Sequence, residues 1–472
     1  MQRLYNSCRD LDKRCYEKYA LTEDILMENA SLGMANYIRA NFSRGSSLLI
    51  VVGVGNNGAD GIVLARLLYG YCSVRVYIPS PLKSDMAKIQ FQRTKRVGIE
   101  FVDDIIESDI VVDALFGAGL NRKLDTTTQD IIGRINRLQG FKIACDIPTG
   151  IGVDGEAMPV AIYTDVTITM GALKESLYSD SAKEFVGDII CVELGVVRDI
   201  YEIPTDSYLL DRDDLKLPSR TSLDTHKGSF GHLAVISGVK EGASILSAMA
   251  SLRFGVGLAT IVGEPKTLLP YSIMRDSYLP YNTTAIAFGM GFGREFDSDI
   301  VESIANSNIP IILDADIFGS TTIKRFLSQT TREIILTPHP KEFVSMWRVI
   351  YDESISVATL QSNRLKFVRK FCSSYPDITL ILKGANSIIA KDKESFINPH
   401  GSPKLSKGGS GDVLSGLIGA LLAQGYSSLE SAINASLALV VASDSYNGGS
   451  YAMLPTDLIE EIGKLEKNSS TV

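Results

Sequence analysis

Hydrophobic residues in the first part of the chain occur in short runs, separated by longer segments of helical period. The runs are rich in β-branched residues and occupy positions 48–52, 74–78, 110–112, 143–145 and 166–169. Between the first two runs, segment 62–69 repeats apolar residues at the spacing of an amphipathic helix. Alternation of buried strands with helices is typical of a parallel, doubly wound α/β sheet. We therefore predict such a sheet in the first part of the chain.

The same rhythm resumes after a polar stretch, 196–225, in which Pro204, Asp211 and Pro218 interrupt any regular element. We place a domain boundary near Asp211, which divides the chain into domains 1–211 and 212–472. The strands expected in the second domain are 233–236, 285–288, 311–313, 334–336 and 380–382. These runs are apolar throughout, as strands buried on both faces of a parallel sheet are. A second doubly wound parallel sheet is therefore expected.

The composition agrees with two globular domains and indicates which class of ligand the chain binds. The chain has 472 residues, more than one hydrophobic core normally serves. Its formal net charge is -8, and no block rich in Lys and Arg offsets that charge. Such a balance argues against a nucleic-acid partner. The expected ligand is a small molecule.

Cysteine spacing and apolar stretches indicate the compartment. The 6 cysteines include no C-x-x-C pair, which fits neither a disulfide framework nor a zinc site. Residues 1–6 are polar and lack the apolar core of a signal peptide. The most apolar stretch, 413–423, falls short of the roughly 20 residues that a membrane-spanning helix needs, so we predict a buried helix. We expect a cytoplasmic protein without a membrane partner.

A glycine-rich turn, Gly408-Gly-Ser-Gly-Asp412, directly precedes this apolar stretch. Glycines allow successive N–H groups to point at one anion, and the dipole of a helix that begins there adds positive potential. Asp412, in the first turn, is placed to accept a hydroxyl proton. An ordinary loop with Asp412 as helix cap is the alternative, but four small residues before the acid favour a site. The pattern G-x-x-x-x-G-K-[ST] of a P-loop is absent.

The first expected strand is followed by Gly53-Val-Gly-Asn-Asn-Gly-Ala-Asp60, which contains G-x-G-x-x-G. In this position, backbone N–H groups can hold a pyrophosphate. A dinucleotide-dependent dehydrogenase would also carry an acid after the next strand, and segment 77–80 has none. Capping one helix requires a single polar side chain, whereas this segment offers three: Asn56, Asn57 and Asp60. We therefore favour a binding site.

Two further strands of the first domain end in polar clusters, 113–122 and 145–150. Asp113 or Asp146 alone would be interpreted as a turn cap. Carboxylates or amides beside glycines at several strand ends instead predict a common site, since strand ends of an open α/β sheet face one crevice. Oxygen donors of Asn, Asp and Thr could also hold an alkali or alkaline-earth cation there.

Polar or small residues also follow strands of the second domain. These clusters are 289–294, 313–316, 337–342 and 383–387. His339 lies between two prolines, where it is either a plain loop residue or a contact of the substrate. Its position at a strand end favours substrate contact.

The first domain resembles the NAD(P)H-hydrate epimerase family, a Rossmann-like fold. The resemblance rests on Asn56–Asp60, on Asp146–Gly150, and on Leu26–Ala30, where we expect the preceding helix to end. It implies a potassium ion held by Asn57, Asp113 and Thr149, and Asp146 as the acid/base residue. The implied substrate contacts are Asn56, Asn57, Gly58, Ala59, Asp60, Gly117, Ala118, Gly119, Leu120, Asn121, Arg122, Lys123 and Asp146. Ala59 replaces the usual glycine and Thr149 the usual serine, which preserves size or oxygen chemistry.

The second domain resembles the ADP-dependent NAD(P)H-hydrate dehydratase family, a branch of the ribokinase-like superfamily. The glycine-rich turn, 226–231 and 242–244 carry this resemblance. It implies contacts to the hydrated nucleotide from Ala243, Gly293, His339 and Asp412. Contacts to ADP, with Mg²⁺, are implied for Lys383, Gly384, Ala385, Asn386, Ser387 and Gly411. Lys404 and Lys407 occupy positions where the family is expected to have less charge, so the choice between ADP and ATP stays open. The role of Lys407 also stays open: its side chain contacts either a phosphate or solvent.

The whole chain resembles the family in which these two domains are fused. The resemblance implies epimerisation of R and S hydrates of NADH and NADPH (NADHX and NADPHX) at C6, followed by ADP-dependent dehydration of the S form. Asp412 would be the base of the second step, with AMP and phosphate as products. We also expect a homo-oligomer. A small-molecule kinase and a nucleotide-binding scaffold are the alternatives that the residues leave open.

Overall fold

The computed structural model describes residues 1–293, 298–328 and 332–466 and divides the chain into two compact units. One unit comprises Gln2–Thr205, and the other comprises Asp206–Val472 together with Met1. Asp211, near which the boundary was predicted, lies inside the second unit. Arg294, the last residue of one predicted polar cluster, lies outside the described residues.

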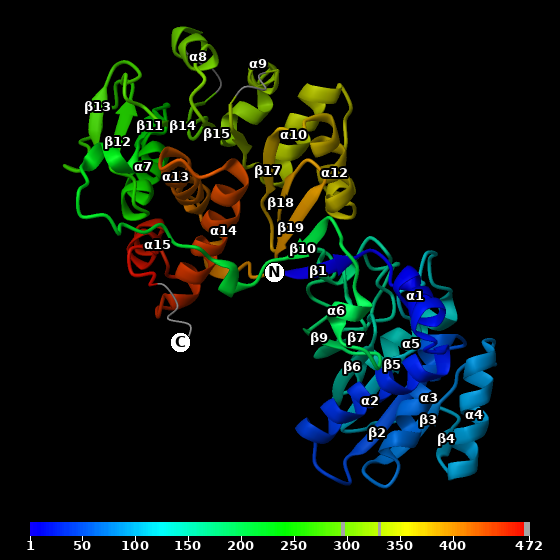
Figure 1. The fold of residues 1–472 in the computed structure, drawn as a ribbon. Coiled ribbons are helices and arrows are strands. Elements are labelled where there is room, and N and C mark those ends of the chain that lie inside the picture. Colours follow the sequence, from blue (N-terminus) through cyan, green and yellow to red (C-terminus); the bar gives the residue numbers. More distant parts are fainter. Residues whose placement is uncertain (294–297, 329–331, 467–472) are drawn as a thin grey trace. The chain divides into compact units, whose positions relative to one another are not determined.

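The first unit contains a parallel sheet of order β4-β3-β2-β5-β6-β7-β9 (Figure 1). Its strands are β2 (Ser47–Val52), β3 (Ser73–Tyr77), β4 (Glu100–Val102), β5 (Ile110–Ala114), β6 (Phe141–Cys145), β7 (Val166–Met170) and β9 (Asp188–Val192). Every strand predicted for this domain is present. The order reverses direction beside β2, as in a doubly wound sheet, so the predicted α/β architecture is confirmed.

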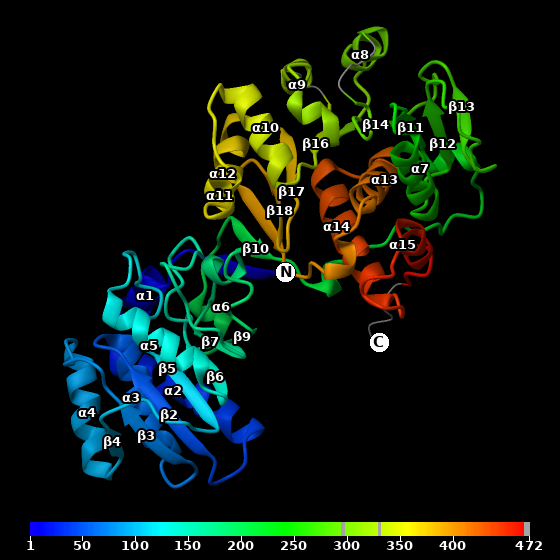
Figure 2. The ribbon, with the colours of Figure 1, turned by 180° about the vertical axis from the view of Figure 1, so that it is seen from behind.

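Helices cover both faces of this sheet because β2 is apolar on both of its faces. Leu48 and Ile50 pack with α2 (Glu23–Asn41) and α3 (Asn56–Leu68), whereas Leu49 packs with α5 (Thr126–Arg137). Helix α4 (Asp85–Val97) contacts α3 (Figure 2). The prediction that a helix ends at 26–30 is wrong, because buried Met34, Ala35 and Ile38 continue its apolar face to Asn41.

A set of short elements packs near the carboxyl ends of these strands. It consists of β1 (Gln2–Tyr5), α1 (Arg9–Tyr19), β8 (Leu173–Lys174), η1 (Glu175–Tyr178) and α6 (Arg198–Tyr201). Strands β1 and β8 pair in parallel, and Leu11 of α1 is buried with Leu194 and Tyr201. Segments from opposite ends of the unit's sequence therefore meet.

The second unit contains a sheet of order β13-β12-β11-β14-β15-β16-β17-β18-β19-β10. The strands are β10 (Ser207–Leu209), β11 (His232–Ile236), β12 (Leu258–Val262), β13 (Met274–Asp276), β14 (Ala285–Phe288), β15 (Ile311–Leu313), β16 (Ile334–Leu336), β17 (Ile378–Leu382), β18 (Ser387–Lys391) and β19 (Glu394–Asn398). From β13 to β17 neighbouring strands are parallel, as predicted. The expected second parallel sheet is therefore present, and it is extended by β18, which is antiparallel to β17 and β19. The short β18–β19 turn, with Asp392 at φ 51, permits only an antiparallel pair.

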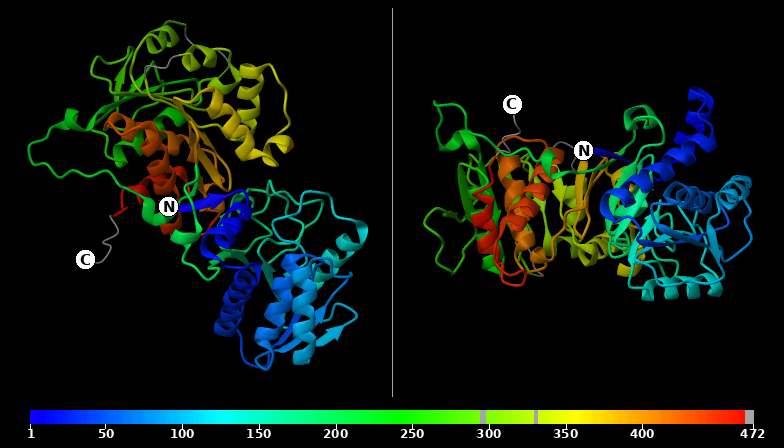
Figure 3. Two further views of the ribbon diagram at one scale, coloured as in Figure 1. Left: turned by 45° about the vertical axis from the view of Figure 1, so that its right-hand side comes forward. Right: turned by 90° about the horizontal axis from the view of Figure 1, so that it is seen from below.

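Two groups of helices cover the second sheet. One face packs against α7 (Glu241–Arg253), α13 (Ser410–Ala423), α14 (Ser428–Ser445) and α15 (Pro455–Ile462). The other packs against α8 (Ser298–Ala305), α9 (Ile323–Leu327), α10 (Pro340–Tyr351), α11 (Val357–Gln361) and α12 (Arg364–Ser374). Helix α13 contacts both α7 and α14 (Figure 3). Its residues 413–423 are all buried, which confirms the predicted buried helix.

The polar stretch 196–225 is largely irregular, as predicted, but it contains α6, β10 and the 3₁₀ turn η2 (Arg212–Asp214). None of the helices within the described ranges has the length and apolar character needed to cross a membrane.

Candidate active sites

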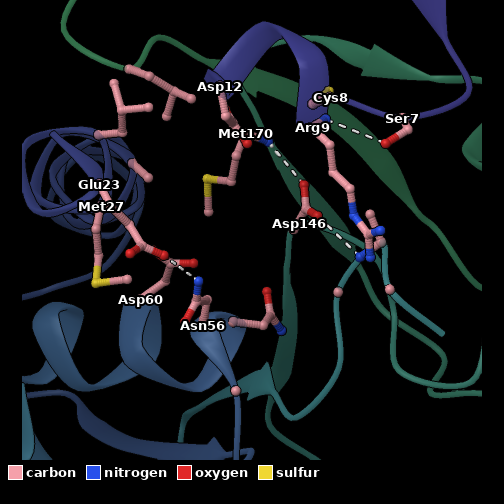
Figure 4. A pocket seen from close by; sticks show the side chains of 18 of the residues that line it. Ser7, Cys8, Arg9, Asp12, Glu23, Met27, Asn56, Asp60, Asp146 and Met170 are labelled. Atoms are coloured by element: carbon pink, nitrogen blue, oxygen red, sulfur yellow. Dashed lines mark hydrogen bonds between the residues drawn. The ribbon is translucent and has the colours of Figure 1, made fainter. Parts of the chain in front are cut away.

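A cavity of about 490 Å³ lies in the first unit, beside the carboxyl ends of β2, β5, β6 and β7. Residues on its lining that the sequence predicted are Asn56, Asn57, Asp60, Gly117, Ala118, Gly119, Leu120 and Asp146. Figure 4 shows Asp60 and Asp146 on different walls, the first from α3 and the second from the turn after β6. The parallel sheet has therefore brought separate polar clusters into one cavity.

Asp146 has its two carboxylate oxygens in different surroundings. Its Oδ1 accepts hydrogen bonds from Lys174 Nζ at 2.6 Å, Thr169 Oγ1 at 3.2 Å and Met170 N at 3.2 Å. Its Oδ2 accepts from Ala118 N at 3.3 Å, on the cavity wall. The backbone of Asp146 has φ 73, in the left-handed region that is uncommon for residues other than glycine. The turn after β6 thus holds this side chain in a defined direction.

Acidic residues dominate the charge of the cavity. Asp12, Glu23 and Asp60 line it together with Asp146, whereas Arg9 and Lys174 are its basic lining residues. Burial, and then the negative charges of Asp146, Asp12 and Glu23, raise the pKa of Asp60 well above its ordinary value. The cavity therefore holds two kinds of carboxyl group. Asp146 forms an ion pair with Lys174, whereas Asp60 favours its protonated form.

Asn56, Asn57 and Asp60 do not cap the helix that they begin. The cap position of α3 is Gly55, which has no side-chain cap bond, and the Asn56 amide instead donates to Glu23. The sequence interpretation allowed one of these three polar side chains to cap the helix, and in the structure none of them does.

Asp113 and Thr149 form a buried pair next to the cavity without lining it. Thr149 Oγ1 lies 2.7 Å from Asp113 Oδ1, and Thr149 N donates to Asp113 Oδ2 at 2.7 Å. Burial raises the pKa of Asp113 to about 6, although its hydrogen bonds from Thr149 and Leu115 act in the opposite direction. Thr149 Oγ1 also accepts from Phe116 N at 2.9 Å, which links the pair to the cavity wall.

Several predicted contacts lie away from the lining. Ala59 is fully buried, and a side chain at Gly58 would come within 2.0 Å of the Gly53 carbonyl oxygen. The loop that follows the lining residue Leu120 carries exposed Asn121, Arg122 and Lys123. The structure therefore gives Gly58 and Ala59 a packing role beneath the cavity.

The sequence interpretation missed a group of lining residues: Ser7, Cys8, Arg9, Asp12, Tyr16, Lys174 and Tyr201. Lys174 follows a predicted strand closely, so extending the strand-end argument to 166–169 would have found it. The N-terminal residues carried no such signal, because α1 reaches the cavity only through packing with segments distant in sequence.

In the second unit, the glycine-rich turn begins helix α13 as predicted. Gly409 has φ 102, α13 starts at Ser410, and Asp412 lies in the first turn. Burial and the nearby charge of Asp314 raise the pKa of Asp412 to about 6, and Lys383 opposes this rise. A carboxylate with such a pKa can take up a proton near neutral pH.

Lys383 lies between acidic residues beside this turn. Its Nζ is 2.9 Å from Asp314 Oδ1 and 3.9 Å from Glu342 Oε2. A side chain at Gly411 would lie 3.4 Å from the same ammonium. Ser415, on α13, donates to Asp314 Oδ2 at 2.8 Å. An ammonium, a carboxylate and a helix start thus meet where the sequence predicted only separate clusters.

His339 caps helix α10. Its Nδ1 accepts hydrogen bonds from the backbone N of Lys341 at 3.1 Å and of Glu342 at 3.2 Å. Glu342 Oε2 in turn accepts from His339 N at 2.8 Å, and burial raises the pKa of Glu342 to about 7. One nitrogen of the imidazole is therefore engaged in the cap, while the side chain is 47% exposed.

The remaining predicted residues of this unit lie at neighbouring strand ends. Gly293 N donates to Asp316 Oδ2 at 2.9 Å, and Ala243 lies in the first turn of α7. In the loop after β17, Gly384 and Ala385 are exposed, Asn386 is buried and Ser387 is half-buried. Arg364, a buried residue that the sequence interpretation missed, donates to the carbonyls of Lys383 and Asn386 and so braces this loop.

Lys404 and Lys407, the two lysines at positions where less charge was expected, both bind backbone carbonyls. Lys407 Nζ donates to the Tyr451 carbonyl at 2.7 Å. Lys404 Nζ donates to the carbonyls of Ser443 at 3.0 Å and Tyr446 at 2.9 Å. The structure thus gives Lys407 a third role, an anchor for the chain around Tyr451.

Family models match each unit separately. A model described as YjeF-related protein N-terminus matches residues 23–176, and one described as NAD(P)H-hydrate dehydratase matches residues 233–464. Each match contains most of the polar strand ends of its unit. The lining residues Cys8, Asp12 and Tyr201 lie outside the first match.

Known proteins are similar to the whole chain. The bifunctional NAD(P)H-hydrate repair enzyme of Helicobacter pylori is 39% identical over 476 residues, which covers 98% of this chain and 100% of that protein. The protein of the same name from Coxiella burnetii is 30% identical, covering 96% and 97%. A solved ADP/ATP-dependent NAD(P)H-hydrate dehydratase from Bacillus subtilis is 24% identical with a TM-score of 0.44, covering 54% of this chain and 94% of that one. The chain belongs to the family of bifunctional NAD(P)H-hydrate repair enzymes.

Proposed function

We propose that the chain repairs hydrated NADH and NADPH in two steps. The first unit interconverts the R and S forms of NADHX and NADPHX at C6, and the second dehydrates the S form with ADP. The observation that carries this proposal is the 39% identity to a repair enzyme over the full length of both chains. The presence of an acid/base candidate in each unit, Asp146 and Asp412, agrees with two chemical steps.

In the epimerisation step, Asp146 exchanges a proton with the substrate. Inversion at C6 requires a bond of this carbon to open and re-form, which moves a proton at the hydroxyl group. Asp146 Oδ2 is suited to this because it lies on the cavity wall, whereas Oδ1 is held by Lys174. The substrate would contact Asn56–Asp60 and Gly117–Lys123, of which the cavity lining includes Asn56, Asn57, Asp60 and Gly117–Leu120.

A potassium ion would be held by Asn57, Asp113 and Thr149. The donor set fits, because all three offer oxygen atoms and the Asp113 carboxylate is 1% exposed, with neutral donors from Leu115 and Thr149 as its hydrogen-bond partners within the described part of the chain. A cation there would compensate a buried negative charge and stabilise the loop of Phe116 through Thr149. Asp113 and Thr149 hold that loop in place.

In the dehydration step, Asp412 takes the proton of the C6 hydroxyl. The freed oxygen then attacks the terminal phosphoryl group of ADP, and the bond between that group and AMP breaks. Phosphate leaves with the C6 oxygen, a proton leaves the adjacent ring carbon, and the ring double bond re-forms. The products are NAD(P)H, AMP and phosphate.

ADP would contact Lys383–Ser387 and Gly411, and the hydrate would contact Ala243, Gly293, His339 and Asp412. The Lys383 ammonium beside Gly411 supports this, since it puts a positive charge at the start of α13. The described residues hold no group of at least three His, Cys, Asp or Glu side chains suited to a metal. Mg²⁺ would therefore be carried mainly by the nucleotide phosphates, as is usual for this ion.

The chain would work in the cytoplasm as a homo-oligomer. All 6 cysteines are free, which fits a reducing compartment. Sedimentation of the purified chain measures the oligomeric state, and a monomer at working concentration would refute the proposed homo-oligomer.

The test is to incubate the protein with mixed R and S hydrates of NADH and with ADP, while following the absorbance of reduced nicotinamide. Complete recovery of absorbance, with one AMP and one phosphate formed per NADH, is expected. A phosphorylated product that persists would indicate a kinase instead. No turnover in either domain would indicate a nucleotide-binding scaffold and refute the proposal.

A further inference from the structure

The ammonium of Lys174 is buried against Asp146. The Nζ–Oδ1 distance is 2.6 Å, and the two side chains are 3% and 13% exposed. Nζ also donates to Thr169 Oγ1 at 2.8 Å and to the carbonyls of Met170 at 3.2 Å and Ala172 at 3.4 Å. Lys174 is therefore fixed by the chain between β7 and β8 before any substrate binds.

The ion pair treats the two oxygens of Asp146 unequally. Oδ1 accepts from Lys174, Thr169 and Met170, whereas the one donor to Oδ2 among the described residues is the backbone of Ala118, on the cavity wall. A buried ion pair adds little net stability compared with an apolar pair of the same size. Its main consequence at this position is therefore geometric, since the side chain of Asp146 cannot rotate without breaking the three hydrogen bonds at Oδ1 and the one at Oδ2.

We propose that Lys174 is a positioning residue of the epimerase site, whose ammonium holds Oδ1 of Asp146 and so presents Oδ2 to the substrate. This inference rests on the proposed epimerisation. The proton moves between the substrate hydroxyl and Oδ2, while Lys174 keeps its own protons and contacts the substrate only through Asp146. The carboxylate is thus ready to accept a proton in a defined direction.

The test uses the full-length protein with R-hydrate as substrate and compares Lys174→Met, Asp146→Asn and the double variant. A displaced acid/base group costs about 100-fold in rate. We therefore expect Lys174→Met to lower kcat by about that factor with KM nearly unchanged. The double variant should be no slower than Asp146→Asn, because Lys174 acts through that residue. A raised KM with unchanged kcat would make Lys174 a substrate contact, and multiplicative losses in the double variant would make it independent of Asp146. Either result overturns the inference.

Matched variants separate positioning from folding. Lys142→Met removes a lysine of the same unit whose Nζ binds the carbonyls of Leu138 and Gly140, and it should keep the wild-type kcat. Lys174→Gln keeps a neutral donor of similar length and carries the test if Lys174→Met does not fold. A wild-type kcat in Lys174→Gln contradicts the inference. Urea unfolding of the same variants reports whether the first unit is folded, since dehydration of S-hydrate depends on the other unit. Failure of the wild-type protein to epimerise would refute the proposed function itself, whereas normal epimerisation by Lys174→Gln refutes only the role of Lys174.

Discussion

Lys383 Nζ lies 2.9 Å from Asp314 Oδ1, although these residues follow different strands, β17 and β15, between which β16 lies in the sheet. Ser415 donates to the other oxygen of Asp314 and so holds the carboxylate from the side of α13. Asp314 and Glu342 raise the pKa of Lys383 against the effect of burial. The ammonium therefore stays charged beside Gly411, where the phosphates of a nucleotide would be attracted.

Lys383→Met should raise the KM for ADP by about 10-fold or more, because a charge-assisted hydrogen bond to phosphate contributes about 1.5–3 kcal/mol. Lys407→Met is the matched control, since this lysine flanks the same turn but donates to the Tyr451 carbonyl. Steady-state kinetics with S-hydrate measures both. Equal effects of the two substitutions would show that Lys383 has no special role in binding ADP.

The dehydration rate should depend on the protonation of Asp412. Its pKa is raised to about 6, and only the carboxylate form accepts the substrate proton, so activity should rise with pH and reach half of its plateau near pH 6. Measurement of kcat/KM from pH 5 to 8 checks this rise, which is the acidic limb of the pH profile. Glu342, whose pKa is raised to about 7, also faces Lys383, and Glu342→Gln should leave the limb near pH 6 in place. Asp412→Asn should abolish dehydration, and residual activity that still rises with pH near pH 6 would exclude Asp412 as the base.

Asp146→Asn should separate the two activities. The variant should still consume S-hydrate rapidly with ADP, because Asp412 belongs to the other unit. R-hydrate should disappear only at the rate of its spontaneous conversion. Chromatographic separation of the two forms over time provides the measurement. Equal loss of both forms at the wild-type rate would contradict the assignment of Asp146.

Replacement of K⁺ by tetramethylammonium should destabilise the first unit as well as slow epimerisation. A ligand at about 100 times its Kd adds about 2.7 kcal/mol to the free energy of unfolding. Thermal unfolding followed in both salts at equal ionic strength gives this difference. Asp113→Asn should unfold at the same temperature in both salts, because the charged ligand is lost. An identical unfolding temperature of the wild-type protein in both salts would disprove potassium binding.

Gly58→Ala should destabilise the first unit. Its Cβ would lie 2.0 Å from the Gly53 carbonyl oxygen, and overpacking of this kind typically costs about 1–3 kcal/mol. Gly55→Ala, in the same turn, is the control because no atom lies within 4 Å of its Cβ position. Urea unfolding of both variants measures the difference. A Gly58→Ala variant as stable as Gly55→Ala would mean that the turn relaxes without cost.

Much of the fold was predictable because buried parallel strands have a local signature. The runs at 48–52 and 311–313 are apolar throughout. The first lies within β2, and the second coincides with β15 residue for residue. Edge elements such as β13, all three of whose residues are exposed, lack that signature and escaped prediction. The end of α2 was misplaced. Leu26, Met27 and Ala30 line the cavity, but the helix continues to Asn41 because its buried face extends through Met34, Ala35 and Ile38.

The sequence by itself determined the order of strands and helices, the polar strand ends and the glycine-rich start of α13, because each depends on neighbouring residues. Only the tertiary structure decided which of these groups meet. Lys174 reaches Asp146, and α1 closes the cavity, through contacts between segments far apart in the chain. Parallel strands bring such segments to one edge, but the distances between side chains there depend on how the whole unit packs.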